Sequence, residues 1–352
     1  MLIGVPRELQ PDESRVALTP DGADVLVQAG HEVVASSDDV WKRATVVVRV
    51  KESVRSEWPK MHRGQVIFTY LHLAADGEST RACPTSRAVC IACETVELPT
   101  GGLPLLLAMS EIAGRMAVQE GAEHLAKPQG SRGVLLGGVP GVTPGKVVIP
   151  GGGVVGTNAA KRAAGLGTRV SIMDIGLPRL RYPDAALPKN VTWVFSTPQT
   201  IREGIADAEP VIGTVVRGGA RTPHLFRRAD LRKTKPGSVI VEVSLDQGGC
   251  AENIRPTTQH GPVYVVGNVL HYGVPKMPGA RPPTSTSALA HATLPYTVAL
   301  AGKARQKACV EDAAPELNVN AADGRLTHRR AAGAFGMPGV DVDTFLQTKR
   351  AA

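Results

Sequence analysis

The stretch VVIPGGGVVGTNAAKRAAGLGTRVSIMD, residues 147–174, decides the fold of the second half of the chain. It reads as a strand, a glycine-rich turn, a helix and a second strand that ends on Asp174. Gly151, Gly153 and Gly156 have the G-x-G-x-x-G spacing, which suits a tight turn, close backbone approach to a pyrophosphate and close helix–strand packing. The amino end of the helix then points free N–H groups at the phosphates. The stretch therefore predicts a dinucleotide site in which Asp174 accepts the ribose 2′-hydroxyl of NAD and repels the 2′-phosphate of NADP.

Pro150 stands where the first of these two strands should still be pairing. Proline has no backbone N–H, so it fits a sheet at an edge, at a bulge or where the chain leaves the ladder. We therefore expect Pro150 to be the last residue of its strand.

Length and composition favour a two-domain α/β protein. The chain has 352 residues, which exceeds the usual size of one domain, and 43% of them are hydrophobic against 20% charged. Aromatic residues make up only 4%, which argues against a protein that stacks on nucleic-acid bases. The formal net charge of +8 comes from scattered residues and is interpreted as a solvated surface that attracts anionic ligands. No nucleic-acid partner is expected.

The cysteines and the amino terminus predict a cytoplasmic location. Cys90 and Cys93 form a C-x-x-C pair inside the apolar run RAVCIACETV, without a second pair at ligand spacing. They are interpreted as buried reduced thiols, and no metal is expected. The few, unevenly spaced cysteines fit a reducing compartment. The first residues lack the pattern of a signal peptide, and no apolar run reaches membrane length.

Strands and helices alternate along most of the chain. Near-continuous apolar strands predict parallel sheets covered on both faces, so we expect two doubly wound, Rossmann-like domains with an active-site cleft between them. Residues 1–104 together with 283–352 form the predicted substrate domain, and residues 105–282 form the predicted NAD-binding domain. The tail after the helix near residue 300 is expected to be loose. The expected strands are 2–6, 31–35, 44–50, 65–70 and 87–94 in the first domain, and 147–150, 169–174, 210–216, 238–244 and 263–267 in the second.

Polar side chains follow the predicted strands at the ends where ligands collect in open α/β sheets. Lys51, His72 and Glu94 each follow a strand of the first domain, Arg15 lies in the loop after its first strand, and Asp246 follows a strand of the second domain. Each could be a solvated or capping residue when taken alone. Together they suit one chemistry, because two cations bind a small carboxylate, a histidine exchanges a proton and an acid orients water or an amine. That set predicts oxidation of a small amino or hydroxy acid with hydride passing to NAD.

Longer motifs carry a family resemblance over nearly the whole chain. The sequence resembles bacterial L-alanine dehydrogenases, more than the related transhydrogenase subunit, which lacks the MSEIAGR stretch. The resemblance rests on GVPRELQPDESRVALTP, FTYLHLAA, CETVE, MSEIAGRMAVQEGA, GSRGVLLGGVPGV, GGGVVGTNAAKRAAGLG, LDQGGC and ATLPY.

The resemblance implies a reversible oxidative deamination of L-alanine by NAD and water, giving pyruvate, ammonia and NADH. It implies that Arg15 and Lys51 bind the substrate carboxylate, that His72 is the general acid and base, and that Asp246 activates water. It implies a homo-oligomer, a hexamer. Residues implied to shape the substrate pocket are Tyr70, Glu94 and Met109. Residues implied to contact NAD are Ser110, Gly151, Gly153, Val154, Val155, Gly156, Asp174, Arg179, Ser196, Val215, Val216, Val243 and Asp246.

Three departures from the family pattern keep two alternatives open. After GHEVVA the chain lacks a glycine-rich loop and a helix, so we expect an incomplete first sheet with an exposed apolar face. Lys276 stands in place of an asparagine, and Arg217 lies in a loop that is apolar in the family. The alternatives are an NAD-binding paralogue with reduced or altered activity, and a dehydrogenase for another small 2-oxo or 2-amino acid. Absorbance of NADH in a mixture of protein, L-alanine and NAD discriminates among the three.

Overall fold

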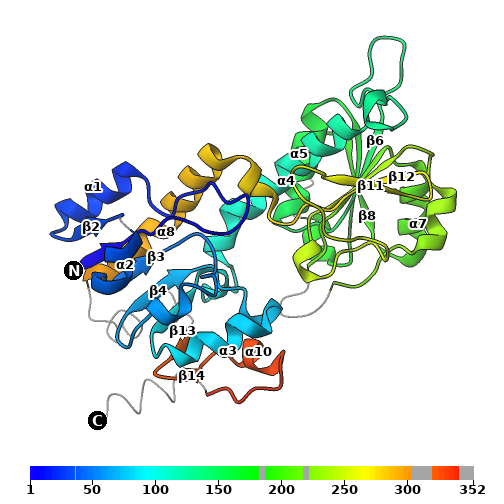
Figure 1. Cartoon of the computed structure of the whole chain (residues 1–352). Helices are drawn as coiled ribbons and strands as arrows, with labels where there is room; N and C mark the ends of the chain where they lie inside the picture. The colour runs from blue at the N-terminus through cyan, green and yellow to red at the C-terminus, as the bar shows by residue number, and fades with distance from the viewer. Residues whose placement is uncertain (36, 182–186, 217–221, 303–318, 341–352) are drawn as a thin grey trace. The chain divides into compact units, whose positions relative to one another are not determined.

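The chain folds into two compact units in a computed structural model (Figure 1). The structure describes residues 1–352 apart from 36, 182–186, 217–221, 303–318 and 341–352. Unit 1 consists of Met1–Met109 and Gly279–Ala352, and unit 2 consists of Ser110–Pro278. The chain therefore leaves unit 1 once and returns to it.

The sheet of unit 1 has the strand order β14-β13-β5-β4-β3-β1-β2. Five neighbouring strands are parallel, in the order 2-1-3-4-5 of a doubly wound fold: β1 (Leu2–Gly4), β2 (Glu32–Val34), β3 (Val46–Val48), β4 (Val66–Thr69) and β5 (Val89–Ala92). Two antiparallel strands, β13 (Val319–Ala322) and β14 (Arg325–Leu326), extend it beyond β5.

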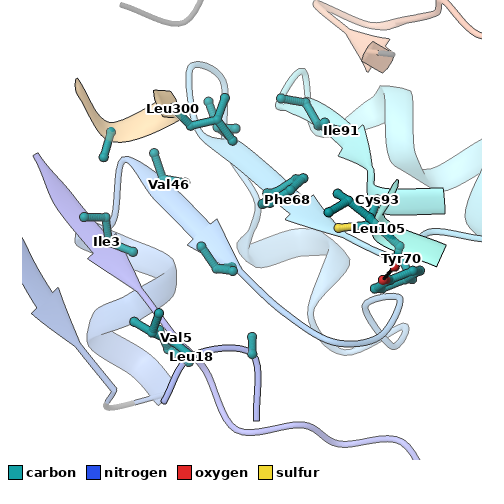
Figure 2. Packing of buried hydrophobic residues seen from close by; sticks show 14 of the residues in the cluster. Ile3, Val5, Leu18, Val46, Phe68, Tyr70, Ile91, Cys93, Leu105 and Leu300 are labelled. Carbon is teal, nitrogen blue, oxygen red and sulfur yellow. Dashed lines mark hydrogen bonds between the residues drawn. The ribbon is translucent and has the colours of Figure 1, made fainter. Parts of the chain in front are cut away.

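Alternating apolar side chains build a core on each face of this sheet. Ile3, Val46, Phe68 and Ile91 point to one face, where they pack with Leu300 of α8 and with Leu18 before α1 (Figure 2). Their neighbours along the strands point to the other face, as the two-residue period of a strand requires. The helices of unit 1 are α1 (Pro20–Gln28), α2 (Ser37–Arg43), α3 (Gly77–Thr85), the start of α4 (Pro104–His124), α8 (Pro282–Gly302) and α10 (Arg329–Gly333), with the 3-10 turns η1 (Trp58–Lys60), η2 (Leu73–Ala75) and η3 (Cys93–Thr95).

The expectation of an incomplete sheet with an exposed apolar face is wrong. The short segment after β2 forms α2, which buries Val40 and Trp41 against the sheet. The two elements lie so close that a methyl group added at Gly4 would sit 2.6 Å from Val40. A single short helix therefore covers this part of the sheet.

The expectation of a loose tail is also wrong for its described part. Residues 319–326 add an antiparallel hairpin to β5, and Asn320 accepts hydrogen bonds from Ala92 N at 3.0 Å and Thr95 Oγ1 at 3.0 Å. The turn of the hairpin is Asp323-Gly324, with φ values of 46° and 88°. An Asp-Gly pair between two short strands is a strong hairpin signal, and it could have revealed this element.

Unit 2 contains a sheet with the strand order β11-β12-β10-β9-β6-β7-β8. Six parallel strands follow the 3-2-1-4-5-6 order of a Rossmann fold: β6 (Lys146–Pro150), β7 (Arg169–Asp174), β8 (Val191–Phe195), β9 (Pro210–Gly213), β10 (Val239–Glu242) and β12 (Val269–Tyr272). The strand β11 (Val263–Val266) is antiparallel to β12. Its other elements are the rest of α4, α5 (Val154–Gly165), α6 (Leu177–Arg181), α7 (Pro198–Asp207), η4 (Lys127–Gln129), η5 (Arg228–Lys233), η6 (Leu245–Gln247) and the start of η7 (Met277–Ala280).

Both sheets confirm the predicted fold class of two doubly wound, Rossmann-like domains. Cys83, Cys90, Cys93 and Cys250 are buried and free, which confirms buried thiols at the C-x-x-C pair, while Cys309 lies outside the described residues. Among the helices that the structure describes, none has the length and apolar character needed to cross a membrane.

Candidate active site

The glycine loop lies between β6 and α5, where the sequence predicts it. Pro150 is the last residue of β6, as expected, and Gly151 N donates to Met173 O at 2.7 Å. The carbonyl oxygen of Pro150 accepts hydrogen bonds from Thr214 N at 3.0 Å and Thr214 Oγ1 at 2.8 Å. Pro150 has no N–H to donate toward β9, but its carbonyl group anchors the loop to the segment after β9.

Two glycines of the motif occupy positions where a side chain does not fit. A methyl group at Gly156 would lie 1.8 Å from Gly151 O, and one at Gly151, where φ is 106°, would lie 2.6 Å from Thr214 Oγ1. Gly153 is the N-cap of α5 and offers no capping side chain, so the first turn keeps N–H groups for a ligand. The cradle fits a pyrophosphate group held by backbone N–H groups.

We expect Gly156→Ala to weaken dinucleotide binding by roughly tenfold or more, because the new methyl group displaces the backbone of the loop. Fluorescence titration with NAD measures the effect. Gly165→Ala is the matched control, since a methyl group at Gly165 meets nothing within 4 Å. The control should keep its affinity and gain about 0.5–1 kcal/mol of stability. Equal affinity in both variants would contradict a phosphate cradle at Gly156.

Asp174 ends β7 beside the glycine loop. Its Oδ2 accepts a hydrogen bond from Gly152 N at 2.7 Å, and its Oδ1 accepts one from Gly176 N at 2.7 Å. The exposed side chain of Arg179 also reaches the loop, because a methyl group at Gly153 would lie 3.5 Å from its Nη1. An acid and a cation thus flank the loop, at places suited to a ribose hydroxyl and a phosphate.

Of the remaining residues expected to contact NAD, Val154 and Val155 lie within the glycine motif, and the others lie on neighbouring segments. Ser196 N donates to Asp174 O at 2.9 Å, and Val243 N donates to Gly213 O at 2.9 Å. Ser110 lies one helical turn before Gly114, where α4 packs on α5 so closely that a methyl group would be 2.2 Å from Val155 O. Val154 and Val216 are exposed, and Val155 and Val215 are half-buried. Asp246 lies in η6, and its side chain falls outside the described residues, as does Arg217.

In unit 1 the polar residues after the strands come together. Lys51 follows β3 and His72 follows β4, and Lys51 Nζ lies 3.1 Å from His72 Nε2. Glu94 follows β5 and accepts a hydrogen bond from His72 N at 2.6 Å. Parallel strands bring their carboxyl ends to one edge of the sheet, and this edge carries the predicted cation, base and acid.

Arg15 is held by an acid that sequence reasoning did not identify. Glu13 accepts from Arg15 Nε at 2.7 Å and from Arg15 Nη2 at 2.5 Å, and both side chains are buried. Burial raises the pKa of Glu13, but the hydrogen bonds and charge of Arg15 and the charge of Lys51 outweigh it, so the pKa lies below its usual value. The acid-x-arginine spacing of residues 13–15 could have suggested this pair.

Met109 and Tyr70 border the same cluster. Arg15 Nη1 lies 3.4 Å from Met109 Sδ, and Tyr70 stacks on His72 with 6.2 Å between ring centroids. The Tyr70 hydroxyl donates to Leu105 O at 2.5 Å, visible as the dashed line in Figure 2. Burial raises the pKa of Tyr70, so its hydroxyl stays protonated and serves the packing of α4.

The structure thus brings together Arg15, Lys51, Tyr70, His72, Glu94 and Met109 in unit 1. In unit 2 it places Asp174 and Arg179 at the glycine loop. That both groups line one interdomain cleft stays a prediction. Lys276 is half-buried after β12 with a φ of 58°, and its proximity to substrate likewise stays a prediction. Within the described residues no group of three or more His, Cys, Asp or Glu side chains could hold a metal ion.

A double Rossmann architecture with a glycine cradle in one unit and a cation–histidine cluster in the other defines a two-domain, dinucleotide-dependent class of protein. Models of the alanine dehydrogenase/PNT family match the chain, the N-terminal domain over residues 27–113 and the C-terminal domain over residues 117–329. The chain belongs to the alanine dehydrogenase/PNT family. This membership implies a nicotinamide cofactor, and the cradle fits one.

Individual relatives are similar over nearly their full lengths. An alanine dehydrogenase of Halomonas elongata is 45% identical over 370 residues, covering 98% of this chain and 100% of the relative. One of Methanococcus maripaludis is 42% identical over 363 residues, covering 96% and 97%. A solved structure of an L-alanine dehydrogenase superposes with a TM-score of 0.91 at 45% identity, covering 96% of this chain and 99% of that one. A transhydrogenase of Sinorhizobium meliloti shares the fold at 20% identity, with a TM-score of 0.80, covering 93% and 100%.

Proposed function

We propose that the protein is an NAD-dependent L-alanine dehydrogenase. The reaction is L-alanine, NAD⁺ and water giving pyruvate, ammonium, NADH and a proton, and it is reversible. The observation that carries the proposal is the cluster of Arg15, Lys51 and His72 on one sheet edge, in a chain whose close relatives are alanine dehydrogenases. The same cluster would not be needed by a protein that only bound a dinucleotide.

Lys51 and Arg15 supply the charge that binds the substrate carboxylate. Both side chains are buried, with exposed fractions of 5% for Lys51 and 6% for Arg15, so a carboxylate that reaches them is largely desolvated. Glu13 occupies Nε and Nη2 of Arg15 and leaves Nη1 on the side of Met109. Arg15 is therefore held in one orientation.

His72 is proposed as the general base. We assign the donor role in the contact of Lys51 Nζ with His72 Nε2 to Lys51, because an ammonium group can only donate hydrogen bonds, and this ring nitrogen is then the acceptor. A substrate carboxylate that draws Lys51 toward itself frees Nε2 to take a proton from the amino group or from water. In the reverse direction the protonated ring returns that proton to the substrate oxygen or nitrogen.

The other proposed roles are divided between the substrate in unit 1 and the cofactor in unit 2. When bound, the nicotinamide ring of the cofactor accepts the hydride from the substrate carbon. Asp246 is proposed to activate the water that hydrolyses the imine, while Tyr70 and Met109 shape the pocket. In unit 2, Gly151, Gly153 and Gly156 hold the pyrophosphate, and Asp174 selects NAD by accepting a ribose hydroxyl. Contacts with the rest of the cofactor are proposed for Ser110, Val154, Val155, Arg179, Ser196, Val215, Val216 and Val243.

We expect Asp174→Ala to relax the preference for NAD over NADP. The variant loses the acceptor for the ribose hydroxyl and the charge that repels a 2′-phosphate, so NAD affinity should fall by roughly tenfold while NADP binding is unharmed. Titration with both cofactors measures the ratio. Asp207→Ala removes the same charge from an exposed site in the same unit and is the control. An unchanged ratio in Asp174→Ala would mean that another residue reads the ribose.

Turnover of purified, folded protein tests the function. NADH absorbance should rise with L-alanine and NAD, and should fall with pyruvate, ammonium and NADH. Binding of NAD without turnover of any small amino acid would indicate a paralogue that has lost catalysis. Turnover with a different amino acid only would change the substrate and keep the reaction class.

We propose further that the protein acts as a cytoplasmic homo-oligomer, a hexamer. The four described cysteines are free and buried, in keeping with a reducing compartment, and the resemblance to the family implies the assembly. Light scattering coupled to size-exclusion chromatography measures the mass in solution. A monomer would contradict the proposed assembly and leave the proposed reaction untouched.

A further inference from the structure

Two carboxylates bind successive backbone N–H groups at the carboxyl ends of neighbouring strands. Glu8, in the loop after β1, accepts from Val50 N at 2.7 Å and from Lys51 N at 3.3 Å. Glu94, in η3 after β5, accepts from Leu71 N at 3.1 Å and from His72 N at 2.6 Å. In each pair the second N–H group belongs to a residue of the predicted active site.

Glu8 is itself fixed by a buried cation. Arg49, which is 2% exposed, donates to Glu8 Oε2 at 3.1 Å and to Ser53 Oγ at 3.2 Å, and also pairs with Glu57. Burial raises the pKa of Glu8 although the charge of Arg49 opposes it. Arg49 therefore fixes the position of the Glu8 carboxylate, and this carboxylate in turn fixes the backbone of Lys51.

Glu94 holds the backbone of His72 in an uncommon conformation. His72 has φ 48° and ψ 34°, the left-handed region that residues other than glycine seldom adopt. The two oxygens of Glu94 accept both N–H groups at this bend, which offsets the cost of the conformation. Without them the chain is free to relax, and the imidazole ring would move with it.

We propose that Glu8 and Glu94 are positioning residues, which hold Lys51 and His72 in the arrangement that places Nζ against Nε2. Lys51 and His72 follow different strands, β3 and β4, and their side chains meet at 3.1 Å. The backbone at each residue is held by a carboxylate, whose two oxygens accept hydrogen bonds from two successive N–H groups. This proposal rests on the proposed function, because it assigns the two acids by the residues that they orient.

Substitution by glutamine tests each acid with almost no change of shape. A glutamine side chain has one acceptor oxygen, and its NH₂ group opposes the second backbone N–H. We expect Glu8→Gln to raise the KM for L-alanine and for pyruvate about tenfold with kcat within about twofold, because Lys51 binds the carboxylate. We expect Glu94→Gln to lower kcat by roughly tenfold to a hundredfold with a smaller change in KM, because His72 moves the proton.

Glu209→Gln is the control, since Glu209 is a buried acid of unit 2 that pairs with Arg132 and Lys235 and touches none of Glu8, Lys51 and His72. It should alter the melting temperature without altering KM, and kcat per folded molecule should stay the same. If Glu8→Gln and Glu94→Gln behave like this control, the two acids are structural only and the proposal is overturned. The proposal is also overturned if Glu8→Gln mainly lowers kcat and Glu94→Gln mainly raises KM. Absence of turnover in the unaltered protein would instead overturn the proposed function.

Discussion

His72→Ala should lower kcat by about 10²–10⁴-fold, the range that positioned acid–base groups contribute, and should leave NAD affinity unchanged. The imidazole ring is in contact with Lys51 and lies in unit 1, whereas the glycine cradle belongs to unit 2. Steady-state kinetics with L-alanine measure kcat, and a separate titration with NAD measures the affinity for the cofactor.

His62→Ala is the control for this experiment. His62 is exposed in the same unit, and its ring contacts only the neighbouring Arg63 carbonyl among the described interactions. It should leave kcat and NAD affinity as they are. A fully active His72→Ala enzyme at neutral pH would remove the histidine from the mechanism and leave the carboxylate site standing.

Lys51→Met should raise the KM for L-alanine and pyruvate by roughly tenfold to a hundredfold, which corresponds to one charge-assisted hydrogen bond to the carboxylate. Methionine keeps most of the length of the buried stem, so packing changes little. Loss of the ammonium group also removes the donor that holds His72 Nε2, and a lower kcat should accompany the higher KM.

Lys60→Met provides the comparison, because Lys60 is exposed on η1 and carries the same charge. It should change neither constant. An unaltered KM in Lys51→Met would mean that Arg15 alone binds the carboxylate. Arg15→Met would then be the variant to measure.

Local sequence patterns predicted much of the fold because the decisive signals are periodic and short-range. The glycine spacing and the alternating apolar runs depend on neighbours in sequence, and parallel strands bring their following residues to one edge. Lys51 and His72 could therefore be expected to meet before any coordinates were known, and they do. The strand β8 was not foreseen, since it lies at a sheet edge with no fully buried residue.

The residues that hold the predicted site residues in place could not be predicted from local sequence patterns. Glu13 was within reach, but Glu8 touches Lys51 across more than 40 residues, and only tertiary packing brings it there. The left-handed backbone at His72 gives only a weak local signal, because a positive φ is uncommon for every residue except glycine, although histidine adopts it more often than most. The strand β13 was missed because it pairs with β5 from the far end of the chain.

The backbone conformation of His72 sets folding stability and activity against each other at a single position. Glycine adopts φ 48° without steric cost, whereas other residues lose about 1–2 kcal/mol there. A population of variants selected for heat resistance alone would therefore drift toward glycine at residue 72 and become better folded and inactive. If variants were selected for heat resistance and activity together, we expect histidine to remain at residue 72. The difference in melting temperature between the two selected populations would then measure the stability that the enzyme loses by keeping His72.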